Sequence, residues 1–247
     1  MDNSLLVSIS QQLAAYQSMD VIANNIANVS TPGYRREEPT FQEYLAQVPA
    51  GEGDTTGTQT LSFVQDSGIV RDMSEGPQQT TGGQFDVSLH GKGFFVVQTP
   101  SGPRYTRNGH FGLDTGGQIV DDSGNPVQGD GGAITINPDD GDIHIGVDGT
   151  LSGKNGQLAK LKVVTFTNEP ALQKVGQNMF SATETPNQAV DFKITQGTLE
   201  GSNVQPVVEI SRMIDVMRAY QATATMTQSQ QDLMRQAIDK LGSTPGS

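Results

Sequence analysis

The side chains best suited to chemistry in this sequence are its three histidines and several stretches rich in Asp and Gly. His90, His110 and His144 are scattered along the chain, and none belongs to a His-x-x-x-His pair that would present two nitrogens to one metal ion. We interpret all three as surface or turn histidines. The sequence contains no cysteine, which excludes disulfides, thiolate metal ligands and thiol catalysis.

The Asp/Gly-rich stretches are best interpreted as turns. They lie at Asp121–Asn125, Asp130–Gly132 and Asp139–Asp142, and none has the Asp-x-Asp-x-Asp-Gly spacing with a terminal Glu that a calcium loop uses. The stretch Gly91–Gly93 opens no helix and lacks the third glycine of a dinucleotide-binding loop. We therefore predict no catalytic residue, no cofactor and no metal site, and expect that the protein is not an enzyme.

Composition restricts the class of partner. The net charge of -12 argues against nucleic acid or an anionic membrane, because both attract a basic surface. No apolar run approaches the roughly 20 residues that a membrane-spanning helix needs. The first basic residue is Arg35, so the amino terminus has no basic region of a cleaved signal peptide. If the protein leaves the cytoplasm, we expect it to do so without such a peptide.

Both ends of the chain have the pattern of long amphipathic helices. Large side chains three or four residues apart predict a first helix over about 4–29: Leu6, Ile9, Leu13, Tyr16, Met19, Ile22, Ile26 and Val29. A second series has the strict alternation of a coiled-coil seam: Ile210, Met213, Met217, Tyr220, Ala224, Thr227, Gln231, Met234, Ile238 and Leu241. A seam needs a partner helix, which is either the other end of the same chain or another copy.

The polar residues of the two helices lead to separate expectations: burial for the first helix, and the start and the contacts of the second. Asp20 is the only charge between Asn3 and Gly33, and a helix exposed to solvent would carry more, so we expect the first helix to be buried in an assembly. Ser202 or Asn203 is a suitable N-cap for the second helix. Its seam is least apolar at Thr227 and Gln231, where we expect a looser contact or a lining position. An intramolecular helical hairpin that covers the middle of the chain remains the alternative.

The middle of the chain has the pattern of β-structure. Short apolar or alternating runs, such as Phe94–Val97, are separated by turn signals such as Asn108-Gly109 at the spacing of a sandwich or barrel. The predicted fold class is α+β: long N- and C-terminal helices form a coiled-coil-like α-domain, with an inserted, antiparallel all-β domain. The predicted domains are residues 1–34 with 199–247 for assembly, 35–83 as a connecting or extended segment, and 84–198 as the β-domain. Within 35–83, the run from Phe41 to Leu45 fits a short helix or an extended segment.

Three motifs resemble those of bacterial flagellar rod and hook proteins. The stretch Ala23–Tyr34, Ala-Asn-Asn-Ile-Ala-Asn-Val-Ser-Thr-Pro-Gly-Tyr, resembles the amino-terminal signature of that family. Gly91–Val97 followed by Tyr105–Phe111 is similar to the signature of its central β-domain, and Leu199–Val204 is similar to the start of its carboxy-terminal helix motif, with Met213-Ile214 and Arg218-Ala-Tyr220 beyond. The motifs occur in the family's order and span nearly the whole chain. Length and a single β-domain are most similar to a proximal rod subunit, with a distal rod or hook subunit as the alternative.

The resemblance implies a structural subunit of the rod of the flagellar basal body, which crosses the periplasm and transmits motor torque. It implies export through the flagellar type III apparatus without a cleaved signal peptide. The partners would be other copies and other rod proteins, with no nucleic acid and no membrane span. The residues expected at subunit interfaces are Leu6, Ile9, Leu13, Tyr16, Ile22, Asn24, Asn25, Ile26, Asn28, Pro32, Gly33 and Tyr34 at one end. At the other end they are Ser202, Asn203, Val204, Ile210, Met213, Ile214, Met217, Arg218, Tyr220, Met234, Ile238 and Leu241.

Two further functions compete with this interpretation. A secreted β-rich adhesin or binding module with a helical stalk would show an exposed groove lined by aromatic residues. A glycan hydrolase would need two carboxylates that converge in a cleft, about 5–9.5 Å apart.

Overall fold

The computed structural model describes residues 2–49, 58–176 and 178–242 and confirms the α+β class with a central β-domain. The chain forms two compact units. Unit 1 contains Met1–Ile26, Glu37–Val70 and Gln205–Ser247, and unit 2 contains Ala27–Arg36 and Arg71–Val204. The segment 35–83 that the sequence suggested as one connection therefore contributes to both units. The domain boundaries drawn from sequence stay a prediction.

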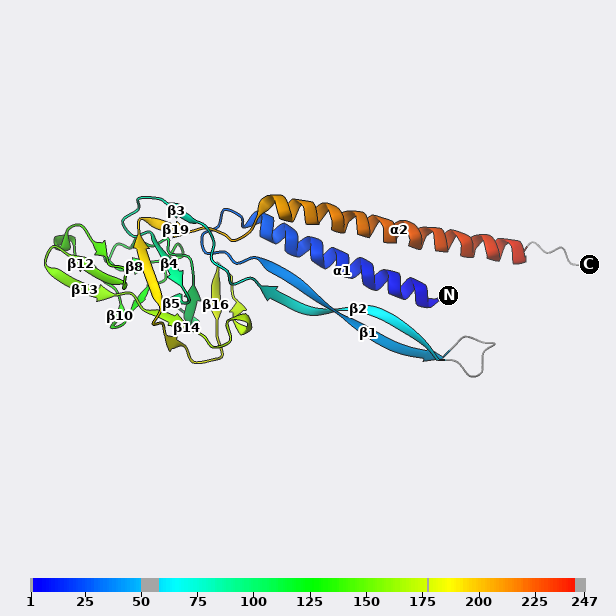
Figure 1. Ribbon diagram of the computed structural model, residues 1–247, viewed down its shortest axis with the longest axis horizontal. Coiled ribbons are helices and arrows are strands. Elements are labelled where there is room, and N and C mark those ends of the chain that lie inside the picture. The colour runs from blue at the N-terminus through cyan, green and yellow to red at the C-terminus, as the bar shows by residue number, and fades with distance from the viewer. Residues whose placement is uncertain (1, 50–57, 177, 243–247) are drawn as a thin grey trace, which may run out of the picture. The chain divides into compact units, whose positions relative to one another are not determined.

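Unit 1 is built from two long helices and a two-stranded sheet (Figure 1). The helices are α1 (Asp2–Ala27) and α2 (Pro206–Gly242), and the strands are β1 (Glu37–Pro49) and β2 (Thr58–Arg71). The helices lie side by side, and the two strands run in opposite directions. With 37 residues, α2 extends over about 55 Å, at roughly 1.5 Å per residue.

Polar bonds connect these elements within unit 1. Gln12 of α1 donates from Nε2 to Thr227 Oγ1 of α2 over 3.3 Å, so the weakly apolar part of the seam contacts the other helix. Gln17 donates to the carboxylate of Asp66 in β2 over 2.6 Å. The run from Phe41 to Leu45 is extended in β1, which decides between the two conformations left open by the sequence.

The second helix begins later than its sequence suggests. Its first residue is Pro206, because the side chains of the two expected N-caps are used elsewhere. The Oδ1 atom of Asn203 accepts a hydrogen bond from the Arg36 amide at 2.7 Å, and its Nδ2 donates to the Asp72 carbonyl at 2.9 Å. Ser202 Oγ accepts from the amide of Val204 at 3.2 Å. The expectation of an N-cap at 202 or 203 was therefore wrong.

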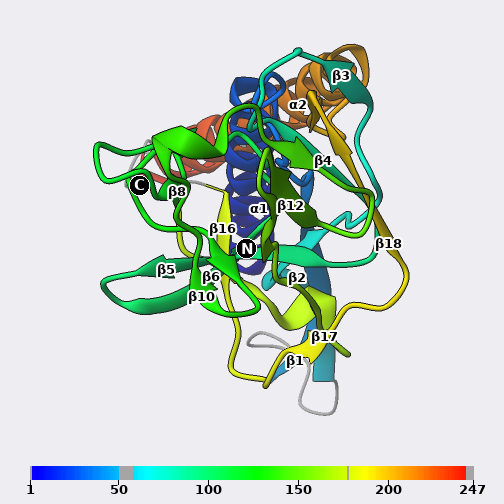
Figure 2. The same ribbon diagram turned by 90° about the vertical axis from the view of Figure 1, so that its left-hand side faces the viewer.

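Unit 2 consists of short antiparallel strands with long turns between them (Figure 2). Its largest sheet has the order β15-β16-β6-β5-β14-β17, and a three-stranded sheet has the order β11-β12-β13. Smaller pairs are β18-β4, β19-β3, β7-β8 and β10-β9. The bounds of the first ten of these strands are β3 Gln78–Thr80, β4 Val87–Gly91, β5 Phe94–Thr99, β6 Gly102–Thr106, β7 Gly112–Leu113, β8 Ile119–Val120, β9 Gln128–Gly129, β10 Gly132–Ala133, β11 His144–Ile145 and β12 Thr150–Gly153. The others are β13 Gly156–Lys160, β14 Val163–Thr165, β15 Gln173–Lys174, β16 Met179–Ser181, β17 Asn187–Gln188, β18 Phe192–Gln196 and β19 Thr198–Glu200, with short 3-10 helices at Pro138–Asp140 and Glu169–Ala171.

The largest sheet is buried on both faces. Along β5, Phe95 and Val97 point into one apolar cluster with Leu89, while Phe94 and Val96 point into a second cluster on the opposite face. Successive side chains of a strand face opposite sides of a sheet, so an uninterrupted apolar run is what a strand covered on both faces requires.

Candidate assembly surfaces and the junction of the three motifs

Unit 1 leaves many large apolar side chains exposed to solvent. Of the predicted interface residues, eight have exposed fractions between 42 and 67%: Leu6, Ile9, Leu13, Tyr16, Ile210, Ile214, Met217 and Ile238. Leu45 of β1 and Val70 of β2 are also about half exposed, at 58 and 50%. A protein that acts as a monomer rarely exposes so many large apolar side chains on neighbouring elements, so these elements have the character of an interaction surface.

The apolar residues of α2 lie on more than one side of the helix. Met213, Tyr220 and Met234 are half-buried, whereas Ile210 and Met217 of the same predicted seam are exposed. A single neighbouring helix can cover only one stripe of residues. Full burial of α2 therefore requires a neighbour in addition to α1. Arg218 is exposed on α2, and the side chain of Leu241 lies outside the described part of the chain.

Asn25 of the amino-terminal motif makes buried polar contacts within unit 1. Asn25 is completely buried, and its amide pairs with the backbone of Glu37: Nδ2 donates to the carbonyl at 2.7 Å and Oδ1 accepts from the amide at 2.9 Å. Nδ2 also lies 3.4 Å from Oε2 of the buried Glu209. Asn24 is exposed, Ile22 is buried and Ile26 is half-buried.

In unit 2 the three motifs meet at one place. The Gly33 amide donates to the Glu200 carbonyl at 2.8 Å, and the Asn203 amide donates to the Tyr34 carbonyl at 3.4 Å. Gly33 has a φ of 68°, and a β-carbon there would collide with the backbone of Arg107 and Asn108. Only glycine fits both the left-handed backbone and this close approach.

Other predicted interface residues are engaged inside unit 2. Tyr34 is 1% exposed and lies under the Lys174 ammonium, which is 4.6 Å from the ring centroid. Ser202 and Val204 are also buried. The carbonyl of Pro32 accepts from Asn178 at 3.2 Å, and Asn28 Oδ1 accepts from the hydroxyl of Thr31 at 3.3 Å. Contact of any of these residues with a second copy stays a prediction.

A buried cluster of three charged residues holds this junction. Arg35 Nη1 lies 2.7 Å from Glu200 Oε1, and Arg107 Nη1 lies 3.5 Å from Glu200 Oε2. The exposed fractions of the three side chains are 1, 4 and 0% for Arg35, Arg107 and Glu200. Burial lowers the pKa of Arg107; Glu200 opposes this shift, and the positive charge of Arg35 adds to it.

Sequence reasoning missed the members of this cluster. Arg35 directly follows the amino-terminal motif, Arg107 lies inside the central motif, and Glu200 lies inside the carboxy-terminal motif. One signal in the sequence could have pointed to a buried charge cluster: each of the three motifs has a charged residue inside it or directly beside it. Their pairing could not be inferred from the sequence, because Arg35 and Glu200 are far apart along the chain.

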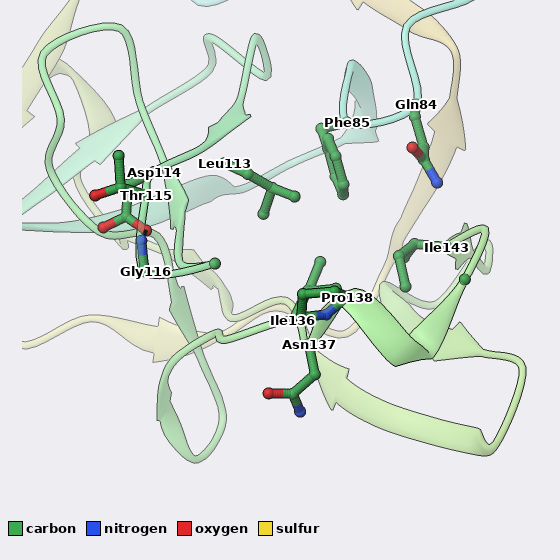
Figure 3. A pocket seen from close by; sticks show the side chains of 12 residues that line it. Gln84, Phe85, Leu113, Asp114, Thr115, Gly116, Ile136, Asn137, Pro138 and Ile143 are labelled. Atoms are coloured by element: carbon green, nitrogen blue, oxygen red, sulfur yellow. Dashed lines mark hydrogen bonds between the residues drawn. The ribbon is translucent and has the colours of Figure 1, made fainter.

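Two features of unit 2 could suggest enzyme chemistry: a cavity and a contact between a histidine and an aspartate. A cavity of about 440 Å³ lies in unit 2. Phe85, Leu113 and Ile136 are among the side chains that line it (Figure 3). His110 Nδ1 lies 2.7 Å from Asp86 Oδ1, whereas its other ring nitrogen faces Asp122 at 3.6 Å. In the described ranges, no group of three or more His, Cys, Asp or Glu residues is arranged to hold a metal ion.

Comparison with known proteins identifies the family. The profile described as "Flagella basal body rod protein" matches residues 5–35, "Flagellar hook protein FlgE/F/G D1 domain" matches 88–153, and "Flagellar basal body rod FlgEFG protein C-terminal" matches 195–240. The chain is 38% identical over 245 residues to the flagellar basal-body rod protein FlgF of Caulobacter vibrioides, which covers 98% of this chain and 99% of the relative. The chain belongs to the flagellar basal-body rod protein family. It is a structural subunit of that family, as the motifs indicated.

Other members of the rod family are similar over the full length. FlgF of Mesorhizobium japonicum is 31% identical over 247 residues, covering 98% of this chain and 99% of the relative. The flagellar basal-body rod protein FlgG of Bacillus subtilis is also 31% identical, over 258 residues, covering 96% of this chain and 98% of the relative. In the part of the rod subunit that the structure describes, no helix is long and apolar enough to cross a membrane.

Proposed function

We propose that this rod-family subunit is an FlgF-like proximal rod protein that polymerises through α1 and α2 and thereby transmits torque. The observation that supports this proposal most directly is the exposed apolar surface of these helices, in particular Ile210, Ile214 and Met217 on α2. Long helices packed side by side between copies resist twisting. Because a head-to-tail contact between copies need not close, such subunits can build a helical rod.

Labelled subunits test the location. The chromosomal gene is replaced by a version with a short epitope in the exposed turn of Asp130 and Gly131 between β9 and β10, and isolated basal bodies are viewed with a gold-labelled antibody. We expect gold on the rod near the motor end. Motile cells whose basal bodies carry no label on the rod would refute the assignment.

A distal rod position is the second candidate, because FlgG proteins are similar over nearly the whole chain. The two positions differ in their dependence on neighbours, since a distal segment grows on a proximal one. Rod precursors from a strain without its own distal rod protein should still contain the labelled subunit if it is proximal. If rod precursors from that strain carry no label, the distal assignment is favoured.

Export and lack of catalysis are part of the same proposal. We infer that the chain travels through the flagellar type III apparatus without cleavage of a signal peptide. Inactivation of that apparatus should leave the intact subunit in the cytoplasm, and mass spectrometry of subunit from basal bodies should find the original amino terminus. Purified subunit should release no soluble fragments from peptidoglycan.

A further inference from the structure

The buried cluster at the junction carries an imbalance of charge. Two guanidinium groups, of Arg35 and Arg107, face the single carboxylate of Glu200. The Nη1 and Nη2 atoms of Arg35 and the Nε atom of Arg107 are buried and make no hydrogen bond to the residues described, so Arg35 Nη1 and Glu200 form a close ion pair without hydrogen-bond geometry. Taking charged groups out of water is costly unless they are paired, so one of the two arginines is not needed to neutralise the carboxylate.

The two arginines are held in different ways. Arg107 donates to the carbonyls of Leu89 and Gly91 at 3.2 and 2.7 Å, and its guanidinium lies 5.4 Å from the centroid of the Phe94 ring. It is therefore fixed inside the β-structure independently of Glu200. Arg35 lies on the segment 27–36, which follows α1 along the chain, and Glu200 is its ion-pair partner.

Glu200 links that segment to the rest of unit 2 through both its side chain and its backbone. Its carbonyl accepts from the Gly33 amide at 2.8 Å, and its Oε1 accepts from the Gly76 amide at 3.0 Å. The residues that follow Glu200 lead to α2. The pair formed by Arg35 and Glu200 thus joins the segment after the first helix to the segment before the second.

We propose that Arg35 is a positioning residue for rod assembly, which fixes the two segments that lead from and to the helices although its side chain is buried within one chain. The Arg107–Glu200 pair stays neutral without it, so Arg35 contributes little to the stability of unit 2. Its role is to hold residues 33–36 against Glu200. This inference rests on the proposed assembly through α1 and α2.

The test compares Arg35→Met with Arg107→Met in the full chain. Each variant removes one arginine and leaves one neutral ion pair. In Arg35→Met we expect a urea midpoint close to that of the parent, at least a tenfold loss of hydrogen-exchange protection at the Gly33 amide, and loss of the subunit from basal bodies. In Arg107→Met we expect a lower midpoint, retained protection at Gly33 relative to the most protected core amides, and retained assembly.

Two further variants separate positioning from stability. Arg35→Lys keeps the charge, and should restore both protection at Gly33 and incorporation into rods, without changing the midpoint. Arg107→Lys replaces Arg107→Met if the latter does not fold. Parental protection and normal incorporation in Arg35→Met would overturn the inference, as would equal loss of incorporation in both methionine variants.

The same experiment distinguishes this inference from the proposed function. If the parental chain itself does not enter rods, the proposed function fails, and hydrogen exchange of the purified variants still decides whether Arg35 holds the segment. If the parent enters rods and Arg35→Met does so equally well, only the role of Arg35 fails.

Discussion

Met217→Asp tests whether the exposed side of α2 contacts other subunits. Met217 is 45% exposed, so the substitution also removes about half of a methionine's packing within one chain, worth roughly 1 kcal/mol. The difference in helix propensity costs about 0.5 kcal/mol. We expect the circular dichroism spectrum of the purified protein to match that of the parent and its urea midpoint to fall only slightly, because the two costs together are about 1.5 kcal/mol.

In an assembled rod the same change should be much more costly. Full burial of a methionine side chain stabilises by about 1.5–3 kcal/mol, so covering the exposed half of Met217 contributes roughly 1 kcal/mol. Burying an unpaired carboxylate in its place costs several kcal/mol more. A total above about 3 kcal/mol weakens each contact more than a hundredfold, since about 1.4 kcal/mol corresponds to a factor of ten.

The assay combines swimming in soft agar with immunoblots of purified basal bodies. Gln236→Asp is the matched control, because it adds the same charge to an exposed polar position of the same helix. We expect Met217→Asp to be absent from basal bodies and Gln236→Asp to be present. Incorporation of Met217→Asp at the parental level would refute the assignment of this side of α2 to an interface, and Ile214→Asp should behave like Met217→Asp.

Three further changes test the units separately. Gly33→Ala should destabilise unit 2 by at least about 2 kcal/mol more than Gly82→Ala in urea unfolding, because both glycines have positive φ but only the β-carbon at 33 meets backbone atoms; equal losses would contradict this. Asn25→Asp should destabilise unit 1 by about 3 kcal/mol, since it places an unpaired carboxylate against a buried carbonyl, and parental hydrogen exchange in β1 would disprove it. Hydrogen bonds from Ser74 lower the pKa of Asp72 below its ordinary value of 3.8. The ionised Asp72 therefore contributes to the stability of the fold in full above pH 3.8, and this contribution is lost as the pH falls through the lowered pKa. Asp72→Asn should therefore make the stability of the protein less sensitive to pH below that value. If the variant loses stability on acidification as steeply as the parent does, the assigned hydrogen bonds are wrong.

Several elements could be predicted from the sequence because their signals are local. The three-and-four spacing from Leu6 onward predicted α1, and the spacing from Ile210 to Leu241 predicted α2, because each repeats the period of an α-helix. The uninterrupted run Phe94–Val97 marked a strand of the central β-domain. The three motifs, which span the chain in order, indicated the family that the comparisons show.

The start of α2 and the conformation of residues 37–49 depended on tertiary contacts. Asn203 has the side chain of a good N-cap, but its oxygen and amide bind backbone groups at 36 and 72, which sequence spacing cannot reveal. The residues of β1 have no decisive pattern of their own, and their pairing with β2 makes them extended. Local propensity is a weak guide where distant segments supply the partner.

The sequence by itself determined the two helices, the β-rich middle and the family, because periodicity and motifs are written in neighbouring residues. Only the tertiary structure decided that Arg35, Arg107 and Glu200 share one buried site, and that Asn25 pairs with the backbone at 37. The physical reason is that a buried charge or amide must find a partner wherever the fold brings one close, and that partner has no fixed distance along the chain.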